Sequence, residues 1–259
     1  MKKTLIALAV AASAVVSGSA MAWTENGTGG AIDLWGILTP VEKVTPWEVK
    51  VGDAVSGLDA QIQKGQKEVS ITVNKAIPVL GIRNADAHGF KGRKGEIHPQ
   101  IDYDGAINLN GFSNGVTTLT LNVTTADGNK LGTLSAPFSS AAVSSWGGSD
   151  GDGSKALYST ASGESFYGGL GKDSSAVRVN GSVELINGLS SDFLAKWVMQ
   201  GSKWDTGVEK FDNETSNYYG AYGAGIESGK TIKITLDQAA SGDAPIQWKA
   251  ALPVTVTYA

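Results

Sequence analysis

The sequence predicts an all-β protein: an antiparallel β-sandwich with insertions and one or two short helices. Segments in which apolar and polar residues alternate recur about every ten residues, a spacing typical of sandwich domains. Thirty-four glycines stand beside only seven prolines, and this composition suits many strands joined by tight turns. Only one stretch of the chain stands out for the apolar spacing of an amphipathic helix. These observations place the chain in the all-β class.

The first 22 residues have the features of a secretory signal peptide. Lys2 and Lys3 precede a short apolar core from Leu5 to Val16, and Ala20-Met21-Ala22 offers a small-x-small cleavage site. The apolar core is too short to span a bilayer. We therefore expect an exported chain that begins at Trp23 and has 237 residues, which is 259 minus 22.

The mature chain is mildly acidic and contains no cysteine. Its formal charge moves from −4 to −6 when the two leader lysines are removed, and no block of basic residues could follow a phosphate backbone. We expect no nucleic-acid partner. Because an exported chain without disulfides lacks that form of stabilisation, it must be held together by the size of its core or by partner molecules.

A strand with one aliphatic side follows the leader and stops at Pro40. The residues on that side are Ile32, Leu34, Gly36 and Leu38. Bulky aliphatic side chains on one side of a strand must be buried. The partner could be the chain's own domain or another molecule. The opposite side carries Trp35 and Ile37, which need a cover of their own.

The next hundred residues alternate clearly. We predict strands at residues 47–51 and 68–73, and another in the apolar run 77–82. Asp104-Gly105 is a hairpin turn signal between residues 101–103 and 106–109. Residues 116–138 predict a second hairpin, which turns at Asp127-Gly128-Asn129.

The second half of the chain is less regular. Residues 139–163 are rich in serine, glycine and aspartate and predict an exposed loop. Residues 166–170 and 177–186 have strand character, and a helix is expected from Ser190 or Ser191 to Gly201. The last strands are predicted at residues 231–236 and 252–258.

The motifs that suggest catalysis or metal binding lack their required context. Residues 111–115 match the G-x-S-x-G pattern, but no helix is predicted after them and both histidines lie upstream. Residues 150–154 resemble the start of a calcium loop, but Lys155 replaces the required glycine. We predict no catalytic residue, no metal and no cofactor, and we expect that the protein is not an enzyme.

Two tryptophans are candidates for carbohydrate binding. Trp146 and Trp204 lie in or beside the irregular segments of the second half, where an exposed aromatic ring could stack on a sugar. The other interpretation is ordinary surface packing, and the sequence does not separate the two.

The C-terminal strand runs to the last residues of the chain. Its apolar residues alternate onto one side: Leu252, Val254, Val256 and Tyr258. A strand that ends the chain with a penultimate tyrosine is typical of pilins of the chaperone–usher route, whose immunoglobulin-like domain lacks its final strand.

The whole chain resembles the FaeG-like fimbrial subunits, which include ClpG. Besides the leader and the last strand, the matching segments are residues 30–34 followed by Gly36, and residues 47–52, 102–106, 166–170 and 225–229. Members of this family also lack cysteine, and this chain resembles them in that respect. The resemblance implies an incomplete immunoglobulin-like β-sandwich that is completed by donor-strand exchange.

The resemblance also implies roles for the two ends of the chain. Residues 1–22 would be the signal peptide, residues 23–40 a donor-strand extension and residues 41–259 the pilin domain. The donor residues would be Ile32, Leu34, Gly36 and Leu38. Val254, Val256 and Tyr258 would border the acceptor groove that a periplasmic chaperone reads. An adhesive insertion is expected around residues 139–217.

The implied protein is a structural subunit of a cell-surface fimbria, exported through the periplasm. Its partners would be neighbouring subunits, the chaperone, an outer-membrane usher and a host glycoconjugate receptor. Two alternatives stay open at this point. One is a secreted, monomeric, lectin-like β-sandwich whose N-terminal strand completes its own sheet. The other, a β-sandwich glycosidase, has no supporting motif.

Overall fold

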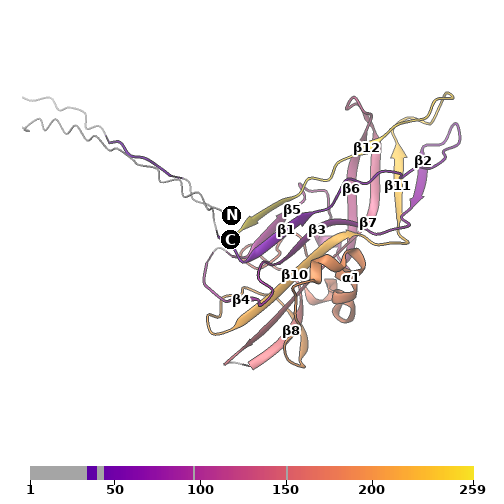
Figure 1. Cartoon of the computed structure of the whole chain (residues 1–259). Coiled ribbons are helices and arrows are strands. Elements are labelled where there is room, and N and C mark those ends of the chain that lie inside the picture. Colours follow the sequence, from indigo (N-terminus) through magenta and orange to yellow (C-terminus); the bar gives the residue numbers. More distant parts are fainter. Residues whose placement is uncertain (1–33, 40–43, 96, 150) are drawn as a thin grey trace, which may run out of the picture. The chain divides into compact units, whose positions relative to one another are not determined.

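A computed structural model describes residues 34–39, 44–95, 97–149 and 151–259. The chain divides into two units, Met1–Lys43 and Val44–Ala259. In the first unit, the described residues 34–39 form neither helix nor strand. The second unit holds all the helices and strands of the described residues (Figure 1). Ile32 lies outside the described residues.

An antiparallel sheet is the main feature of the second unit. Eleven strands belong to it, and its central path has the order β1-β3-β10-β7-β11-β2. Every neighbouring pair on this path is antiparallel. The bounds of these strands are β1 (Trp47–Val51), β2 (Glu68–Thr72), β3 (Ile77–Asn84), β7 (Lys130–Gly148), β10 (Asn217–Ile226) and β11 (Thr231–Leu236). The predicted all-β class is confirmed.

Five further strands branch from the central path, and two more form a separate small sheet. Strand β6 pairs with both β7 and β12, β4 pairs with β10, and β8 joins β7 to β9. Strands β5 and β13 pair only with each other among the described residues. Their bounds are β4 (Phe90–Lys91), β5 (Pro99–Asp102), β6 (Val116–Thr124), β8 (Gly151–Leu157), β9 (Trp204–Gly207), β12 (Lys249–Ala250) and β13 (Thr255–Tyr258).

Helical structure is short and lies mostly between β8 and β9. It consists of one α-helix, α1 (Ser182–Leu189), and the 3₁₀ turns η1 (Leu109–Gly111), η2 (Ser174–Ala176), η3 (Val179–Gly181) and η4 (Ser191–Leu194). Among the described residues, none of these helices is long and apolar enough to cross a bilayer.

An aromatic cluster marks the centre of the main core. Trp47 is buried, donates its indole N–H to the carbonyl of Ile97 at 2.6 Å, and packs edge-on against Phe166. The buried hydroxyls of Tyr103 and Tyr222 lie 2.9 Å apart. Because each hydroxyl has a partner, neither tyrosine leaves an unpaired polar group in the core.

Strand β7 changes character halfway along its length. From Leu131 to Phe138, half-buried and buried residues alternate, as in a strand with one face on a core. From Phe138 to Ser145, every residue is buried. Helix α1 packs there on the second face, where Leu185 and Ile186 belong to a smaller core cluster with β7 and β10 residues. The loss of alternation therefore reflects cover on both faces.

The loop predicted at residues 139–163 is wrong, because most of this stretch belongs to β7 and β8. Small side chains let layers approach both faces of the sheet, and the hydroxyls find partners there. Ser140 donates to the carbonyl of Gly169 at 2.7 Å, and Ser144 donates to Glu209 at 3.1 Å. Because each hydroxyl has a hydrogen-bond partner, burying these serines costs little folding free energy. A serine-rich strand of this kind has the composition that usually indicates a loop, and this is why the prediction failed.

The predicted helix is displaced in the structure. The α-helix occupies Ser182–Leu189, where a strand was expected, whereas residues 191–194 form only a 3₁₀ turn and residues 195–201 form no helix. Leu185, Ile186 and Leu189 have the i, i+1, i+4 spacing that buries one helix face. The glycine in Asn187-Gly188 weakens helix propensity and hides the pattern.

The Asp104-Gly105 turn is present, but the predicted hairpin around it is not. Both residues have positive φ, 52° and 72°, as a tight turn requires. The flanking segments pair elsewhere: β5 pairs with β13, and Ile107 bridges to Leu119 of β6. Tertiary pairing therefore overrides the local hairpin signal.

Candidate functional site: an open groove with two unpaired edges

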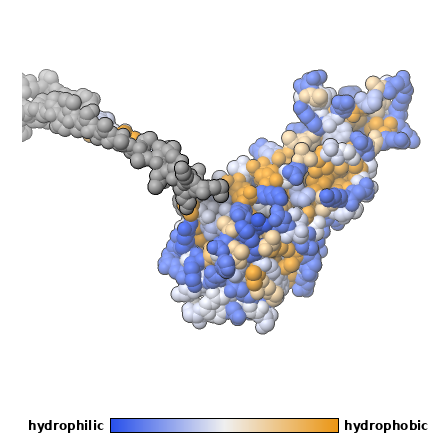
Figure 2. Space-filling view, in the orientation of Figure 1, coloured by the Kyte–Doolittle hydropathy of each residue, from blue (hydrophilic) through white to orange (hydrophobic). Residues whose placement is uncertain are grey.

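A long apolar groove opens on the second unit. Its volume is about 1150 Å³, and Figure 2 shows apolar residues gathered in a band from the middle of this unit toward the part that carries β6, β11 and β2. The floor is formed by aliphatic residues of six strands: Val69, Ile71, Ile77, Val79, Leu119, Leu121, Leu134, Ile226, Ile232, Ile234 and Leu236. Such a surface would normally lie beneath another strand.

The first wall of the groove is the segment that follows β1. Pairing with β3 ends where Gly52 donates to the carbonyl of Val79 at 2.8 Å. In the described chain, residues 53–62 neither donate nor accept a backbone–backbone hydrogen bond. Leu58 and Ile62 nevertheless pack against the main core. This wall is therefore an extended segment with an open backbone edge.

The second wall is the segment from Ala240 to Leu252, which leads into the C-terminal strand. The side chains of that strand alternate between half-buried and exposed from Ala251 to Tyr258. The half-buried members pack against the main core: Leu252, Val254, Val256 and Tyr258. The predicted acceptor-groove residues Val254, Val256 and Tyr258 thus lie on the inward side of this strand, but they are not among the residues that line the groove.

Backbone directions show which edge of the C-terminal strand faces the groove. Ala259 and His98 exchange two backbone hydrogen bonds of 3.1 Å. Because backbone groups alternate between the two edges of a strand, the odd-numbered residues face β5, and Leu252, Val254 and Val256 present theirs to the open edge. Pro253 lacks an N–H only on the β5 side, so it removes no donor from the open edge.

The two walls meet at one end of the groove. Gly65 donates to the carbonyl of Ala240, and Ala240 donates to the carbonyl of Gln66, both at 2.8 Å. Beside them Lys64 forms an ion pair with Asp243. This end is therefore closed, whereas the open edges of residues 53–62 and 251–256 continue beyond it.

The described donor residues are exposed, and their apolar side chains would complement the apolar groove. Leu34 and Leu38 are 92% and 97% exposed, and no atom lies within 4 Å of the Cβ position of Gly36. An apolar floor between two open strand edges can accept an extended peptide with alternating aliphatic residues. Open edges and exposed aliphatics both favour pairing with another chain.

The two carbohydrate candidates lie on the strands that flank β8 but on opposite faces, because Trp146 is opposite Gly153 and Trp204 is opposite Ser154. Trp146 of β7 packs against the main core, with Lys155 Nζ 5.3 Å from its ring centre. Trp204 of β9 packs against the smaller cluster and donates its indole N–H to the carbonyl of Val179 at 2.9 Å. The structure does not bring these two tryptophans together into one platform.

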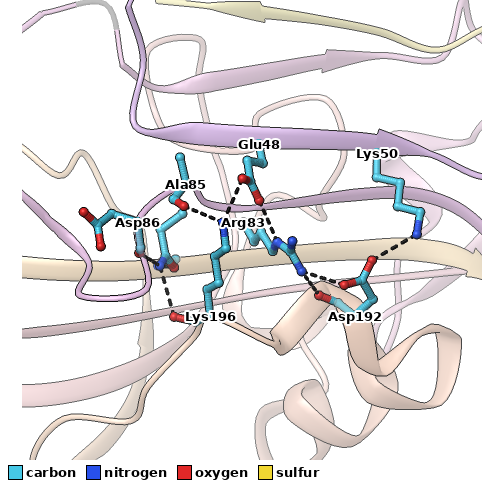
Figure 3. Close-up of polar contacts among 9 residues, drawn as sticks. Glu48, Lys50, Arg83, Ala85, Asp86, Asp192 and Lys196 are labelled. Atoms are coloured by element: carbon cyan, nitrogen blue, oxygen red, sulfur yellow. Dashed lines mark hydrogen bonds and ion pairs between the residues drawn. The ribbon is translucent and has the colours of Figure 1, made fainter. Parts of the chain in front are cut away.

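A charged network fixes the segment after α1 to the strand that leads into the groove wall (Figure 3). Arg83 of β3 lies between Glu48 of β1 and Asp192 of η4, at 3.0 and 2.7 Å. Lys50 pairs with Asp192 at 3.0 Å, and Lys196 pairs with Glu48 at 2.7 Å. Hydrogen bonds from Lys50 and Arg83 hold the pKa of Asp192 below its usual value.

Sequence reasoning missed this network, because its members come from three separate parts of the chain and form no local motif. The G-x-S-x-G segment, by contrast, is the glycine-rich turn expected from its context. Ser113 and Val116 exchange backbone hydrogen bonds of 2.9 and 3.0 Å. The described residues contain no group of three or more acidic, histidine or cysteine side chains placed to hold a metal ion.

Comparison with known proteins shows similarity along the whole chain. The sequence model of a family described as "Fimbrial, major and minor subunit" matches residues 1–259. The chain is 33% identical to K88 fimbrial protein AB and 31% identical to F41 fimbrial protein, both from Escherichia coli. Each comparison covers 100% of both chains.

Proposed function

The chain belongs to the K88 family of major and minor fimbrial subunits, and from that premise we propose that it polymerises by donor-strand complementation. Residues 23–40 of one copy, after removal of residues 1–22, fill the groove of the next copy's domain, residues 41–259. The donor residues are Ile32, Leu34, Gly36 and Leu38. The observation that carries this proposal is the groove, with its apolar floor and two unpaired edges.

This mode of joining produces a filament. The donor segment and the groove are different surfaces of the same chain, so the contact is heterologous and does not close on itself. Ten extended residues span about 33 Å. The ten residues 53–62, which form no backbone–backbone hydrogen bond with any other described residue, offer an open edge of the same length.

During export the groove needs a temporary cover, because an open edge above an apolar floor invites aggregation. A periplasmic chaperone supplies that cover by pairing with the strand that holds Val254, Val256 and Tyr258. An outer-membrane usher then exchanges the chaperone for the donor segment of the next subunit.

The insertion at residues 139–217 carries adhesion to a host glycoconjugate. Two observations support this role: β8, β9 and α1 extend from the second half of β7, and Trp146 and Trp204 are only partly buried there. A half-buried indole leaves ring surface on which a sugar can stack.

Substitution of Leu34 tests the polymerisation proposal. Leu34→Asp would place a carboxylate on the apolar floor, at a cost of roughly several kcal/mol, so we expect the subunit to stay bound to its chaperone and form no fibres. Leu34→Met is the matched control, because it conserves volume and apolarity. Electron microscopy measures fibres, and co-purification measures chaperone binding. Fibres of the Leu34→Asp variant, or its loss of chaperone binding, would contradict the proposal.

Deletion of residues 23–39 separates the filament subunit from a monomeric lectin-like protein. A subunit that donates this segment still folds with the chaperone but cannot polymerise. If the truncated chain fails to fold even with the chaperone present, the segment completes the sheet of its own domain.

A further inference from the structure

The N-terminal segment has a second apolar side that the groove does not cover. In an extended strand, Trp35 and Ile37 point away from the side that carries Leu34 and Leu38. Their side chains are 88% and 84% exposed. Neighbouring large apolar residues on one strand face form a patch of the kind that marks a contact surface. This patch needs a partner other than the groove floor.

The outer face of the C-terminal strand offers a matching surface. Ala251, Pro253 and Thr255 are exposed there and alternate with the inward-facing residues. No charged side chain occurs from Ala250 to Ala259. We call residues 251, 253 and 255 the outer row. Small and uncharged side chains leave room for a large ring beside them.

The opposite wall is a poorer partner for an indole ring. Its exposed residues include one large apolar side chain, Val55, but also Gln61 and the charged Asp53 and Asp59. Packing Trp35 against these groups would remove polar side chains from water without a partner, which is unfavourable. Of the two walls, the C-terminal strand is therefore the one that fits the second apolar side.

From this geometry we infer that Trp35 and Ile37 of one copy pack across the outer row of the next copy in the fibre. The inference rests on the proposed function, because it needs the donor segment inside the groove. Side chains directly opposite each other on paired strands have Cβ atoms about 4.5–5.5 Å apart. A donor whose aliphatic side faces the floor must therefore place residues 35 and 37 beside the outer row.

This packing would fix the donor strand on both of its faces. Leu34 and Leu38 contact the groove floor, and Trp35 and Ile37 make cross-strand contacts on the outer face with Pro253 and its neighbours. The pair would therefore act on how slowly subunits separate, since most affinity differences between related complexes lie in the dissociation rate.

Disulfide crosslinking tests the inference directly, because the chain has no cysteine of its own. Ile37→Cys is combined in the full chain with Ala251→Cys, Pro253→Cys or Thr255→Cys. Alternate residues on a strand lie about 6.6 Å apart, so one of the three positions comes close enough to Cys at 37 in any register that sets residue 37 beside residues 251–255. We expect a ladder of covalent multimers on a non-reducing gel from at least one pair.

Two matched pairs provide the control. Thr231→Cys and Thr235→Cys lie on the exposed face of β11, which does not pair with the C-terminal strand, so neither should crosslink to Cys at 37, although both variants should form fibres by electron microscopy. Crosslinks at these β11 positions in place of the outer row, or no crosslinks at any outer position in intact fibres, would overturn the inference. In either case the fibres themselves would leave the proposed function standing.

The Leu34→Asp substitution, added to a crosslinking pair, distinguishes a failure of the proposed function from a failure of this inference. Loss of both fibres and ladder agrees with the proposed function, and fibres that persist would overturn both proposals. A second readout is the temperature at which fibres dissociate in detergent. We expect Trp35→Ser to lower it by several degrees and Trp35→Phe to change it little. Equal dissociation temperatures for wild type and Trp35→Ser would contradict this packing.

Discussion

The ring of Phe193 rests on a pair of glycines, and this contact predicts a measurable coupling. Gly81 of β3 and Gly223 of β10 are register partners in the sheet. Phe193 is 4% exposed and lies over both: a Cβ added at Gly81 would overlap its ring, and one at Gly223 would lie 3.1 Å from it. The absence of side chains at these two glycines therefore lets the segment after α1 pack closely against the sheet.

The magnitudes follow from this packing. Phe193→Ala removes a buried ring and should cost about 3–5 kcal/mol of unfolding free energy. Gly81→Ala forces the ring to move and should cost about 1–3 kcal/mol. In the double variant the added methyl group enters the space that the ring has left. We therefore expect the double variant to lose less unfolding free energy than the two single variants lose together, and the difference should be about 1–3 kcal/mol.

Thermal unfolding of the purified, assembled protein, followed by circular dichroism, measures these effects. For a chain of this size about 1 kcal/mol corresponds to about 2–4 °C, so the coupling should appear as a difference of several degrees. Gly188→Ala is the matched control, because Gly188 lies in α1 with no atom within 4 Å of its Cβ position. It should be neutral or slightly stabilising. Additive effects of Phe193→Ala and Gly81→Ala, or a neutral Gly81→Ala, would refute the reasoning.

Two further predictions concern acid stability and adhesion. Hydrogen bonds from Arg178, at 2.9 Å to each oxygen, hold the pKa of Glu227 below its usual value. The carboxylate therefore stabilises the fold at neutral pH, and this contribution is lost as the pH falls through the lowered pKa. Glu227→Gln should cost roughly 1–2 kcal/mol at pH 7 and should flatten the loss of melting temperature in acid. Parallel pH profiles for the two proteins would contradict this role. Trp146→Ala or Trp204→Ala should lower fibre binding on a glycan array with unchanged fibre yield, and Trp→Phe at the same site should retain part of the binding; no binding by wild-type fibres would remove the adhesive role.

Strands with one buried face could be predicted from the sequence almost residue by residue. The predicted strands at 47–51 and 231–236 coincide with β1 and β11, and the strand at 68–73 differs from β2 by one residue. In β11 and β2 the alternating pattern records a face on the core and a face in solvent, whereas in β1 only Trp47 is buried. The C-terminal strand was also visible, because Leu252, Val254 and Val256 alternate with small or polar residues.

Segments covered on both faces could not be predicted in this way. In the second half of β7 the alternation disappears, because Ser145 is buried on the face toward Val198 and Ser144 is buried on the opposite face, beside Glu209. Their burial depends on partners distant in sequence, such as Glu209 and the carbonyl of Val198. Helix α1 was missed for a related reason: it is only eight residues long, and its stability comes from packing on the sheet.

By itself, the sequence determined the all-β class, the alternating strands and the aliphatic side of the N-terminal segment, because each of these is a local pattern of period two or of composition. Only the tertiary structure decided that residues 53–62, with their open backbone edge, and residues 240–252 flank one apolar groove. A strand edge is open when no other strand pairs with it. Whether that is so depends on where all the other strands of the chain lie, so no local sequence pattern can record it.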